Sequence, residues 1–380
     1  MQPRGVCRID LDALAHNLRE VRRVVGSAVR VCGVVKADAY GHGAVPVART
    51  LLAHGADSLA VACFDEARDL RRGGIAAPVL VLGGVPASDA TAACELGLSV
   101  VAWDARSLAE LAAALPAGRR LRVHLKFDTG MNRIGAPVAD VGALADAVRG
   151  LAIDVEGVMS HLACGEVVSD ESVARQRARF EEALAALAQQ GLRPGLRHLA
   201  NSGGLLSDPA THYDMVRPGI VLYGALPARE LASRVSVRPV MQLAATVIQV
   251  RDVAAGERVG YGLTFEAKRP SRIAVLALGY AQGVPRSLSN RGAVVVRDRL
   301  APIAGIVSMD HTAIDVTDVP EVATGDEAIF WGRAEEPRLD VMDVGERAGT
   351  LGYELLTRVA ASVPRVYRAR DVARRASGRA

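Results

Sequence analysis

The sequence lacks long apolar runs. No stretch approaches the roughly 18 consecutive apolar residues that a membrane-spanning helix needs, so we expect no membrane partner. The first residues also lack the apolar centre of an export signal, because Arg4, Arg8, Asp10 and Asp12 interrupt them. We therefore expect a cytoplasmic protein.

The sequence also lacks a strong charge of either sign. Its formal net charge is +4 over 380 residues, and aromatic side chains make up only 4% of them. The arginines follow helical faces, and no basic stretch is interleaved with aromatic residues, which is the pattern that nucleic-acid binding favours. We therefore expect no nucleic-acid partner.

Cysteine is scarce as well. The five cysteines form an odd set without any C-x-x-C pair, which argues against a disulfide framework and a structural zinc site. Cys164 follows His161 by three residues, but no further cysteine or histidine stands at ligand spacing. We interpret Cys164 as a small buried thiol and expect no metal.

What the sequence does contain is enough hydrophobic residues, 50%, for a large core. From about residue 29 to 224, short apolar runs alternate with helical patterns, which favours a parallel (β/α)₈ barrel of the TIM type. No G-x-G-x-x-G opens a helix, which argues against a dinucleotide-binding fold. The eight predicted strands lie within 29–37, 58–64, 78–84, 98–104, 121–128, 152–161, 196–202 and 215–224.

After about Val235 the pattern changes to short strands joined by turns. We expect a barrel domain over residues 1–235 and a mostly β domain over 236–380. The predicted strands of the second domain lie within 241–253, 272–283, 293–299, 303–310, 312–319 and 326–332, followed by one helix over 352–362.

Five of the eight predicted barrel strands end on polar side chains. Barrel enzymes build their sites at the carboxyl ends of the strands, so these residues predict one shared site. They are Lys36, Lys126, His161, Asn201 with Ser202, and Arg217 with Gly219.

The loops after the last two predicted strands suit a phosphate group. The stretch "ANSGG" offers the Ser202 hydroxyl and glycine amides, and "VRPGI" offers the amides of Gly219 and Ile220. These glycines could instead only form turns. A phosphate site together with an amine at a strand end points to pyridoxal 5'-phosphate, which a lysine holds as a Schiff base.

The motif "VVKADAYGHG", which contains Lys36, resembles the cofactor-binding signature of the alanine racemase family. The resemblance continues in the family's order along nearly the whole chain, and it implies a barrel followed by a β domain against which the N-terminal strand packs. It also implies a head-to-tail homodimer whose active sites need both subunits. The further motifs are "KFDTGMNRIG", "GVMSHLACGE", "NSGG", "VRPGIVLYG", "GERVGYGLTF", "LALGYAQGVPR", "SMD" and "LGYELLTRVAASVPRVY".

The resemblance implies removal of the substrate's α-proton and its return on the opposite face by two bases, Lys36 and the partner subunit's Tyr261. A phenol is a poor base at neutral pH unless neighbours help it, and His161 matches the histidine that bonds to this tyrosine. Arg217 matches the residue facing the pyridine nitrogen, which stays unprotonated because arginine keeps its proton. Without the resemblance, Arg217 could equally be a surface ion-pair residue.

The resemblance assigns further roles. Lys126 matches a lysine that is often carbamylated and that orients Arg133 toward the cofactor or the substrate carboxylate; an ammonium paired with Asp128 is the alternative. The other matches are Tyr40, Asn201, Ser202, Gly219, Ile220 and Tyr353 for cofactor contacts, the partner subunit's Met309 with Tyr280 for substrate contacts, and Tyr280, Tyr353 and Arg286 for the entrance.

Two residues depart from the family pattern near the entrance. Ile306 replaces an arginine, and Gln282 replaces an aspartate. We predict an alanine racemase that makes D-alanine for peptidoglycan, and a racemase of serine or of broader specificity, in a biosynthetic pathway, remains the alternative. A non-catalytic cofactor carrier would lack the β domain and Tyr261, and a decarboxylase on this plan would carry a cysteine acid.

Overall fold

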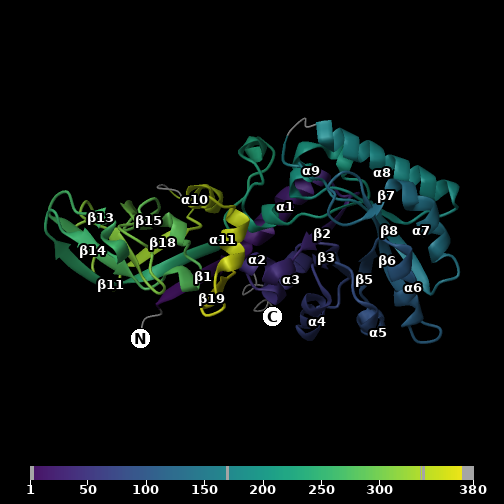
Figure 1. Cartoon of the computed structure of the whole chain (residues 1–380), viewed down its shortest axis with the longest axis horizontal. Coiled ribbons are helices and arrows are strands. Elements are labelled where there is room, and N and C mark those ends of the chain that lie inside the picture. Colours follow the sequence, from purple (N-terminus) through teal and green to yellow (C-terminus); the bar gives the residue numbers. More distant parts are fainter. Residues whose placement is uncertain (1–3, 168–170, 334, 336–338, 370–380) are drawn as a thin grey trace, which may run out of the picture.

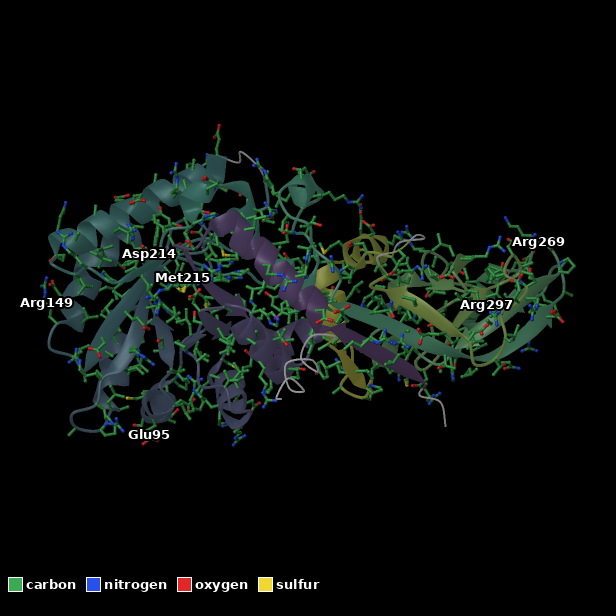
Figure 2. The ribbon with its side chains drawn as sticks, turned by 180° about the vertical axis from the view of Figure 1, so that it is seen from behind. Glu95, Arg149, Asp214, Met215, Arg269 and Arg297 are labelled. Atoms are coloured by element: carbon green, nitrogen blue, oxygen red, sulfur yellow. The ribbon has the colours of Figure 1, made fainter. Side chains whose placement is uncertain are left out.

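The molecule has two parts that lie side by side along its long axis (Figure 1). The computed structural model describes residues 4–167, 171–333, 335 and 339–369. Seen from behind, Asp214 and Met215 lie in the larger part, and Arg269 and Arg297 lie in the smaller part (Figure 2).

Eight parallel strands form the barrel of the larger part, in the order β10-β2-β3-β4-β5-β6-β8-β9. Between the two end strands, the Asp214 N–H donates to the Arg197 carbonyl (3.0 Å) and the Arg217 N–H to the Ala200 carbonyl (3.1 Å). The predicted (β/α)₈ barrel is confirmed. The strands are β2 (Arg30–Val34), β3 (Ser58–Val61), β4 (Val79–Val81), β5 (Ser99–Ala102), β6 (Leu121–Asp128), β8 (Ile153–Met159), β9 (Leu196–His198) and β10 (Met215–Val216), with a short β7 (Ala136–Pro137) paired to β6.

Helices alternate with these strands because their sequences bury one face. The first helix begins where the Asp10 carboxylate accepts the Ala13 N–H (2.8 Å), and it ends at Gly26, whose φ is 77°. Among the described helices, none combines the length and apolar character that crossing a bilayer requires. They are α1 (Leu11–Val25), α2 (Lys36–Gly41), α3 (Ala44–Ala53), α4 (Phe64–Arg72), α5 (Ala90–Glu95), α6 (Ala105–Ala113), α7 (Val141–Val148), α8 (Glu171–Gln189) and α9 (Ser202–Ser207).

The smaller part is mostly β, as predicted. Its longest strand, β11 (Met241–Val253), pairs with β1 (Gly5–Asp10), β14 and β18, and β1 also pairs in parallel with β19. The N-terminal strand therefore lies in the β sheet rather than in the barrel. The remaining elements are β12 (Arg258–Val259), β13 (Phe265–Glu266), β14 (Ser271–Leu276), β15 (Ala293–Val296), β16 (Arg299–Pro302), β17 (Thr312–Asp315), β18 (Glu327–Trp331), α10 (Val341–Ala348), α11 (Gly352–Arg358) and β19 (Arg365–Arg368).

Two expectations for the smaller part are wrong. Residues 303–310 pair with a neighbouring strand only at their start, where the Ala304 N–H donates to the Ala313 carbonyl of β17 (2.9 Å). Beyond it the run forms no strand, because side chains take the backbone groups: the Gly305 N–H donates to Asn290 Oδ1 (2.7 Å) and the Val307 N–H to Ser289 Oγ (2.9 Å). The helix predicted over 352–362 ends at Arg358, because Arg365 takes the carbonyls of the following segment, and helix α10 before it was not predicted.

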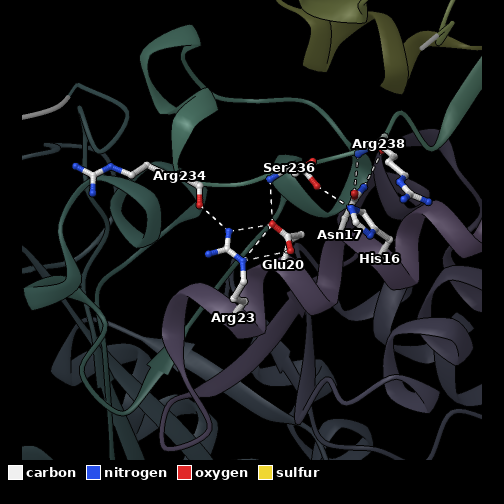
Figure 3. Close-up of polar contacts among 7 residues, drawn as sticks. All are labelled: His16, Asn17, Glu20, Arg23, Arg234, Ser236 and Arg238. Atoms are coloured by element: carbon white, nitrogen blue, oxygen red, sulfur yellow. Dashed lines mark hydrogen bonds and ion pairs between the residues drawn. The ribbon is translucent and has the colours of Figure 1, made fainter. Parts of the chain in front are cut away.

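Helix α1 holds the segment that joins the two parts (Figure 3). Asn17 accepts the Arg238 N–H (2.8 Å) and donates to the Arg238 carbonyl (2.8 Å), while the Ser236 N–H donates to Glu20 (3.0 Å). Arg23 donates to the Arg234 carbonyl (2.9 Å). Since α1 directly follows β1, one stretch of chain ties the β sheet, the connecting segment and the barrel together.

Candidate active site

A cavity of about 490 Å³ opens at the carboxyl ends of the barrel strands. It collects every site residue predicted within the barrel, together with Tyr353 from α11. The predicted residues that line it are Lys36, Tyr40, Lys126, Arg133, His161, Asn201, Ser202, Arg217, Gly219, Ile220 and Tyr353.

The cavity has a strong excess of positive charge. Among the residues that the structure describes, two lysines and two arginines line it, against one carboxylate, that of Glu166. Because buried like charges repel strongly at low dielectric, such a lining favours a ligand that carries several negative charges.

Lys36 lies two residues after the end of β2 and begins an unusual turn. The next four residues, Ala37 to Tyr40, all lie in the left-handed region with φ between 52° and 54°, a conformation that costs about 1–2 kcal/mol for each non-glycine residue. Gly41 and Gly43 complete the turn with positive φ, and a Cβ on them would lie 2.2 Å from the Leu356 carbonyl and 2.0 Å from the Tyr367 hydroxyl. The two glycines of the motif therefore allow the C-terminal elements to approach.

The two cavity lysines have lowered pKa values. Burial, with the nearby Arg133 charge, lowers the pKa of Lys36. Burial and the charges of Arg217 and Arg133 lower the pKa of Lys126 to about 8. A larger fraction of both amines is therefore neutral at physiological pH than for an exposed lysine.

Arg217 lies in the barrel interior, with 3% of its surface exposed, so it is not a surface ion-pair residue. It donates to His198 Nδ1 (2.8 Å), the Ser160 carbonyl (2.8 Å) and His161 Nδ1 (3.2 Å). Burial lowers its pKa to about 10, which still leaves the guanidinium charged at neutral pH.

His161 is held neutral in one tautomer. Burial and the nearby charges of Arg217 and Lys126 hold the pKa of His161 well below its ordinary value. Since arginine can only donate, the Nδ1 that faces Arg217 must accept, and the ring proton is on Nε2. His161 therefore has one N–H to give to a second partner.

Hydroxyl groups and glycines line the same cavity. Ser202 Oγ accepts the Gly219 N–H (2.8 Å), and a Cβ on Gly219 would lie 2.5 Å from the Tyr40 hydroxyl oxygen. Burial raises the pKa of Tyr40 to about 12, so its hydroxyl keeps a proton to donate. Tyr40 is held by its ring contact with Tyr223, with centroids 4.7 Å apart.

Arg133 lies exposed at the mouth of the cavity. Its loop is shaped by Asp128, which accepts the N–H groups of Gly130 (2.8 Å), Asn132 (3.1 Å) and Arg133 (3.0 Å). Both carboxylate oxygens of Asp128 accept backbone N–H groups of this loop. The loop conformation is therefore held by these bonds rather than by an ion pair between Asp128 and Lys126.

Four predicted residues do not line this cavity within one chain, and one of them is the exposed Arg286 of the smaller part. Tyr261, Tyr280 and Met309 lie in the smaller part with 72%, 43% and 55% of their surfaces exposed. Tyr280 and Met309 lie together, because the Tyr280 N–H donates to the Ser308 carbonyl (3.0 Å) and the Ala281 N–H to the Met309 carbonyl (2.9 Å).

The two departures from the family pattern lie among these exposed residues. Gln282 Oε1 accepts the Gly279 N–H (2.9 Å), and its Nε2 donates to Asp310 (2.9 Å). A Cβ on Gly262, the neighbour of Tyr261, would lie 3.7 Å from Ile306 Cδ1. Gln282 thus joins the two segments that carry Tyr280 and Met309, and Ile306 packs beside the segment of Tyr261.

Sequence reasoning missed residues that support the site, among them His198 and Gln176. His198 accepts a hydrogen bond from Arg217 at Nδ1, and its Nε2 lies 2.7 Å from His124 Nδ1. The Nε2 of His124 in turn lies 3.2 Å from Glu156 Oε2. Gln176 accepts the Ala163 N–H (2.8 Å) and donates to the His161 carbonyl (2.9 Å). A histidine inside an apolar run is a signal that could have revealed His198, whereas nothing in the pattern of α8 distinguishes Gln176.

The scarcity of lysine is a second signal in the sequence. The chain contains three lysines, Lys36, Lys126 and Lys268, and two of them line one cavity. Nearly all positive charge in this protein is carried by arginine. A lysine is therefore a candidate for a role that needs an amine rather than a guanidinium.

Known proteins resemble this chain over nearly its whole length. Family models described as the N-terminal and C-terminal domains of alanine racemase match residues 9–227 and 240–367. The chain is 40% identical over 362 residues to alanine racemase 2 of Caldanaerobacter subterraneus subsp. tengcongensis, covering 94% of this chain and 93% of that protein. It is 43% identical over 365 residues to the alanine racemase of Symbiobacterium thermophilum, covering 94% and 96%.

Solved structures resemble it equally well. The crystal structure of alanine racemase from D-cycloserine-producing Streptomyces lavendulae matches with a TM-score of 0.92 at 36% identity, covering 97% of this chain and 98% of that chain.

Proposed function

Since the chain belongs to the alanine racemase family and is an amino-acid racemase, we propose that it interconverts L-alanine and D-alanine by a two-base mechanism. Lys36 serves one face of the substrate, and Tyr261 of the partner subunit serves the other. We assign the product D-alanine to peptidoglycan synthesis in the cytoplasm.

The observation that carries this proposal is the composition of the barrel cavity. A half-buried amine, a buried guanidinium, two hydroxyls and glycine-lined backbone meet in one space, and this donor set fits pyridoxal 5'-phosphate. Tyr40, Ser202, Gly219 and Ile220 would hold the phosphate, together with Asn201 and Tyr353, and Lys36 would hold the carbonyl carbon. When bound, the cofactor delocalises the charge that proton removal leaves on the substrate's α-carbon.

Lys36 takes and returns one proton. An amine acts as a base only when it is neutral, and burial with the Arg133 charge favours that form by lowering the pKa of Lys36. The supporting feature is the turn after Lys36, which fixes the backbone from which the side chain reaches the cavity.

Arg217 and His161 act on two groups other than Lys36, which are the cofactor ring and the second base. With the cofactor bound, Arg217 would offer the cofactor's ring nitrogen a donor that keeps its proton, and this would favour prompt return of the substrate proton over side reactions. His161, fixed as the Nε2–H tautomer by Arg217, has an N–H suited to stabilise the phenolate of the partner subunit's Tyr261.

The exposure of the second base supports a dimer. Tyr261 is 72% exposed in one chain, and Met309 beside Tyr280 is 55% exposed. Large exposed apolar groups on one face are typical of an interaction surface. We propose a head-to-tail homodimer in which this face completes the partner's cavity and Met309 contacts the substrate carboxylate.

We also propose that Lys126 is carbamylated. The ammonium first releases one proton to water, and the neutral amine then attacks carbon dioxide. A C–N bond forms, one C–O π bond opens, and a second proton is released, so that a cation becomes an anion close enough to Arg217 and Arg133 to feel their charge. With a pKa of about 8, the amine is neutral at pH 8 about a hundredfold more often than that of an exposed lysine. The anion would orient Arg133 toward the substrate carboxylate.

The expected result for Lys126 is a carbamate carbon resonance in ¹³C spectra of the protein equilibrated with ¹³C-bicarbonate. The resonance should weaken as the pH falls below about 8, because protonation of Lys126 removes the attacking amine. Lys126→Gln should lack the resonance, whereas Lys268→Gln should keep it. A wild-type protein at pH 8 without this resonance would contradict the assignment.

The function is tested by deuterium uptake at the α-carbon from heavy water, measured by mass spectrometry across a panel of amino acids. We expect alanine to exchange at least about tenfold faster than serine, because a small pocket discriminates by roughly this factor per added group. Faster exchange of serine or equal exchange of several amino acids would instead support the broader racemase. Exchange of none would refute catalysis.

A further inference from the structure

A carboxylate outside the predicted site lies where Lys36 leaves its strand. Glu66, the third residue of α4, accepts the Ala37 N–H with Oε1 (2.6 Å) and the Ala62 N–H with Oε2 (2.7 Å). A glutamate at this helix position ordinarily turns back to an N–H at the start of its own helix. Here Oε1 instead reaches a residue 29 positions earlier in the chain.

The hydrogen bond from Ala37 to Glu66 is made by the most strained backbone segment of the site. Ala37 is the first of the four left-handed residues that follow Lys36, and such conformations persist only where the surroundings hold them. Ala62 follows β3, which pairs with β2. Glu66 therefore fastens the peptide after Lys36 to the end of the neighbouring strand.

The charge of Glu66 acts on the same lysine. Burial and Arg133 lower the pKa of Lys36, and Glu66 opposes them by raising it. The cavity holds four cationic side chains against Glu166, so a second carboxylate behind the lysine reduces the repulsion.

We propose that Glu66 is a positioning residue for Lys36, which holds the peptide that follows the lysine and supplies negative charge beside its amine. This inference rests on the proposed function, in which Lys36 binds the cofactor and acts as a base. Glu66 itself touches neither substrate nor cofactor in this assignment.

The test measures the titration of Lys36 in the full-length chain after removal of the cofactor. Amines are labelled with acetic anhydride at a series of pH values, and the labelled fraction of Lys36 is read by mass spectrometry, with exposed Lys268 as internal reference. Glu66→Gln should move the midpoint of Lys36 labelling to lower pH and leave Lys268 unchanged. In the holoenzyme, the same change should lower kcat/KM about tenfold, because glutamine can accept only one of the two N–H groups.

Asp57→Asn is the matched control. Asp57 also accepts a backbone N–H of a barrel strand, that of Val31 (2.7 Å), and it pairs with Arg22 (2.8 Å). It lies before β3, at the opposite end of the barrel from the cavity. Its removal should leave the titration of Lys36 and kcat/KM unchanged.

A Glu66→Gln protein in which Lys36 titrates as in the wild type and kcat/KM is unchanged would overturn the inference. If Glu66→Gln does not fold, Glu66→Asp carries the test, because it keeps the charge on a shorter side chain. Its labelling midpoint should stay near that of the wild type while kcat/KM falls, and a midpoint shifted as far as expected for glutamine would overturn the electrostatic role. Failure of the proposed function is seen separately, as cofactor absorbance that survives Lys36→Ala.

Discussion

Lys36→Ala is expected to abolish the visible absorbance of the bound cofactor and to lower kcat/KM by at least about 10⁴-fold. The amine both anchors the cofactor and moves a proton, so one substitution removes two functions. Absorbance after mixing with pyridoxal 5'-phosphate and the rate of alanine racemisation measure the two effects. Since burial disfavours the charged amine of Lys36, its loss should not lower the thermal unfolding midpoint when both proteins are compared without cofactor.

The matched control is Lys268→Ala, which removes an exposed lysine of the smaller part. It should keep the absorbance and a kcat/KM within about twofold of the wild type, as surface changes usually do. If the Lys36→Ala protein shows the same absorbance band as the wild type, the cofactor is bound elsewhere and Lys36 is misassigned.

The barrel could be predicted from the sequence because burial imposes a simple pattern on its strands. In β5 every residue is buried, and such a run between helical patterns is typical of a parallel strand. The run 303–310 was also predicted as a strand, yet beyond Ala304 the side chains of Asn290 and Ser289 accept the N–H groups of Gly305 and Val307. Composition reports that a segment is buried, but it does not report which group accepts its N–H bonds.

The position of the site could also be predicted, because all strands of a parallel barrel point the same way. Lys36, Lys126, His161 and Arg217 are far apart in the sequence but follow or end such strands, and they line one cavity. This prediction needed only strand direction and the side chains at the strand ends.

The supporting contacts could not be predicted, since they depend on three-dimensional placement. Glu66 lies on a helix whose charged pattern resembles an ordinary solvated face, yet it accepts the N–H of Ala37. Four successive left-handed residues without glycine have no sequence signature. Tyr261 carries no signal of its own either, because its proposed target belongs to another chain.

Tyr261→Phe is expected to slow α-proton exchange from one enantiomer of alanine about 10³-fold and to slow exchange from the other far less. The two bases serve opposite faces, so losing the phenol leaves Lys36 able to exchange a proton on its own side. Deuterium uptake into L-alanine and D-alanine, measured separately, gives the two rates. Tyr213→Phe, which removes a hydroxyl bonded to Glu181 (2.7 Å) at the opposite end of the barrel from the cavity, should leave both rates unchanged. Equal slowing of both enantiomers by Tyr261→Phe would refute the two-base assignment.

Hybrid dimers test where the phenol comes from. Lys36→Ala and Tyr261→Phe chains are each inactive in this scheme, but a hybrid of the two has one site with both changes and one with neither. Dissociating and mixing equal amounts should therefore restore about a quarter of the wild-type sites, since half of the random dimers are hybrids with one intact site of two. If Lys36 and Tyr261 of the same chain formed a site, every site in the hybrid would carry one change and mixing would restore nothing.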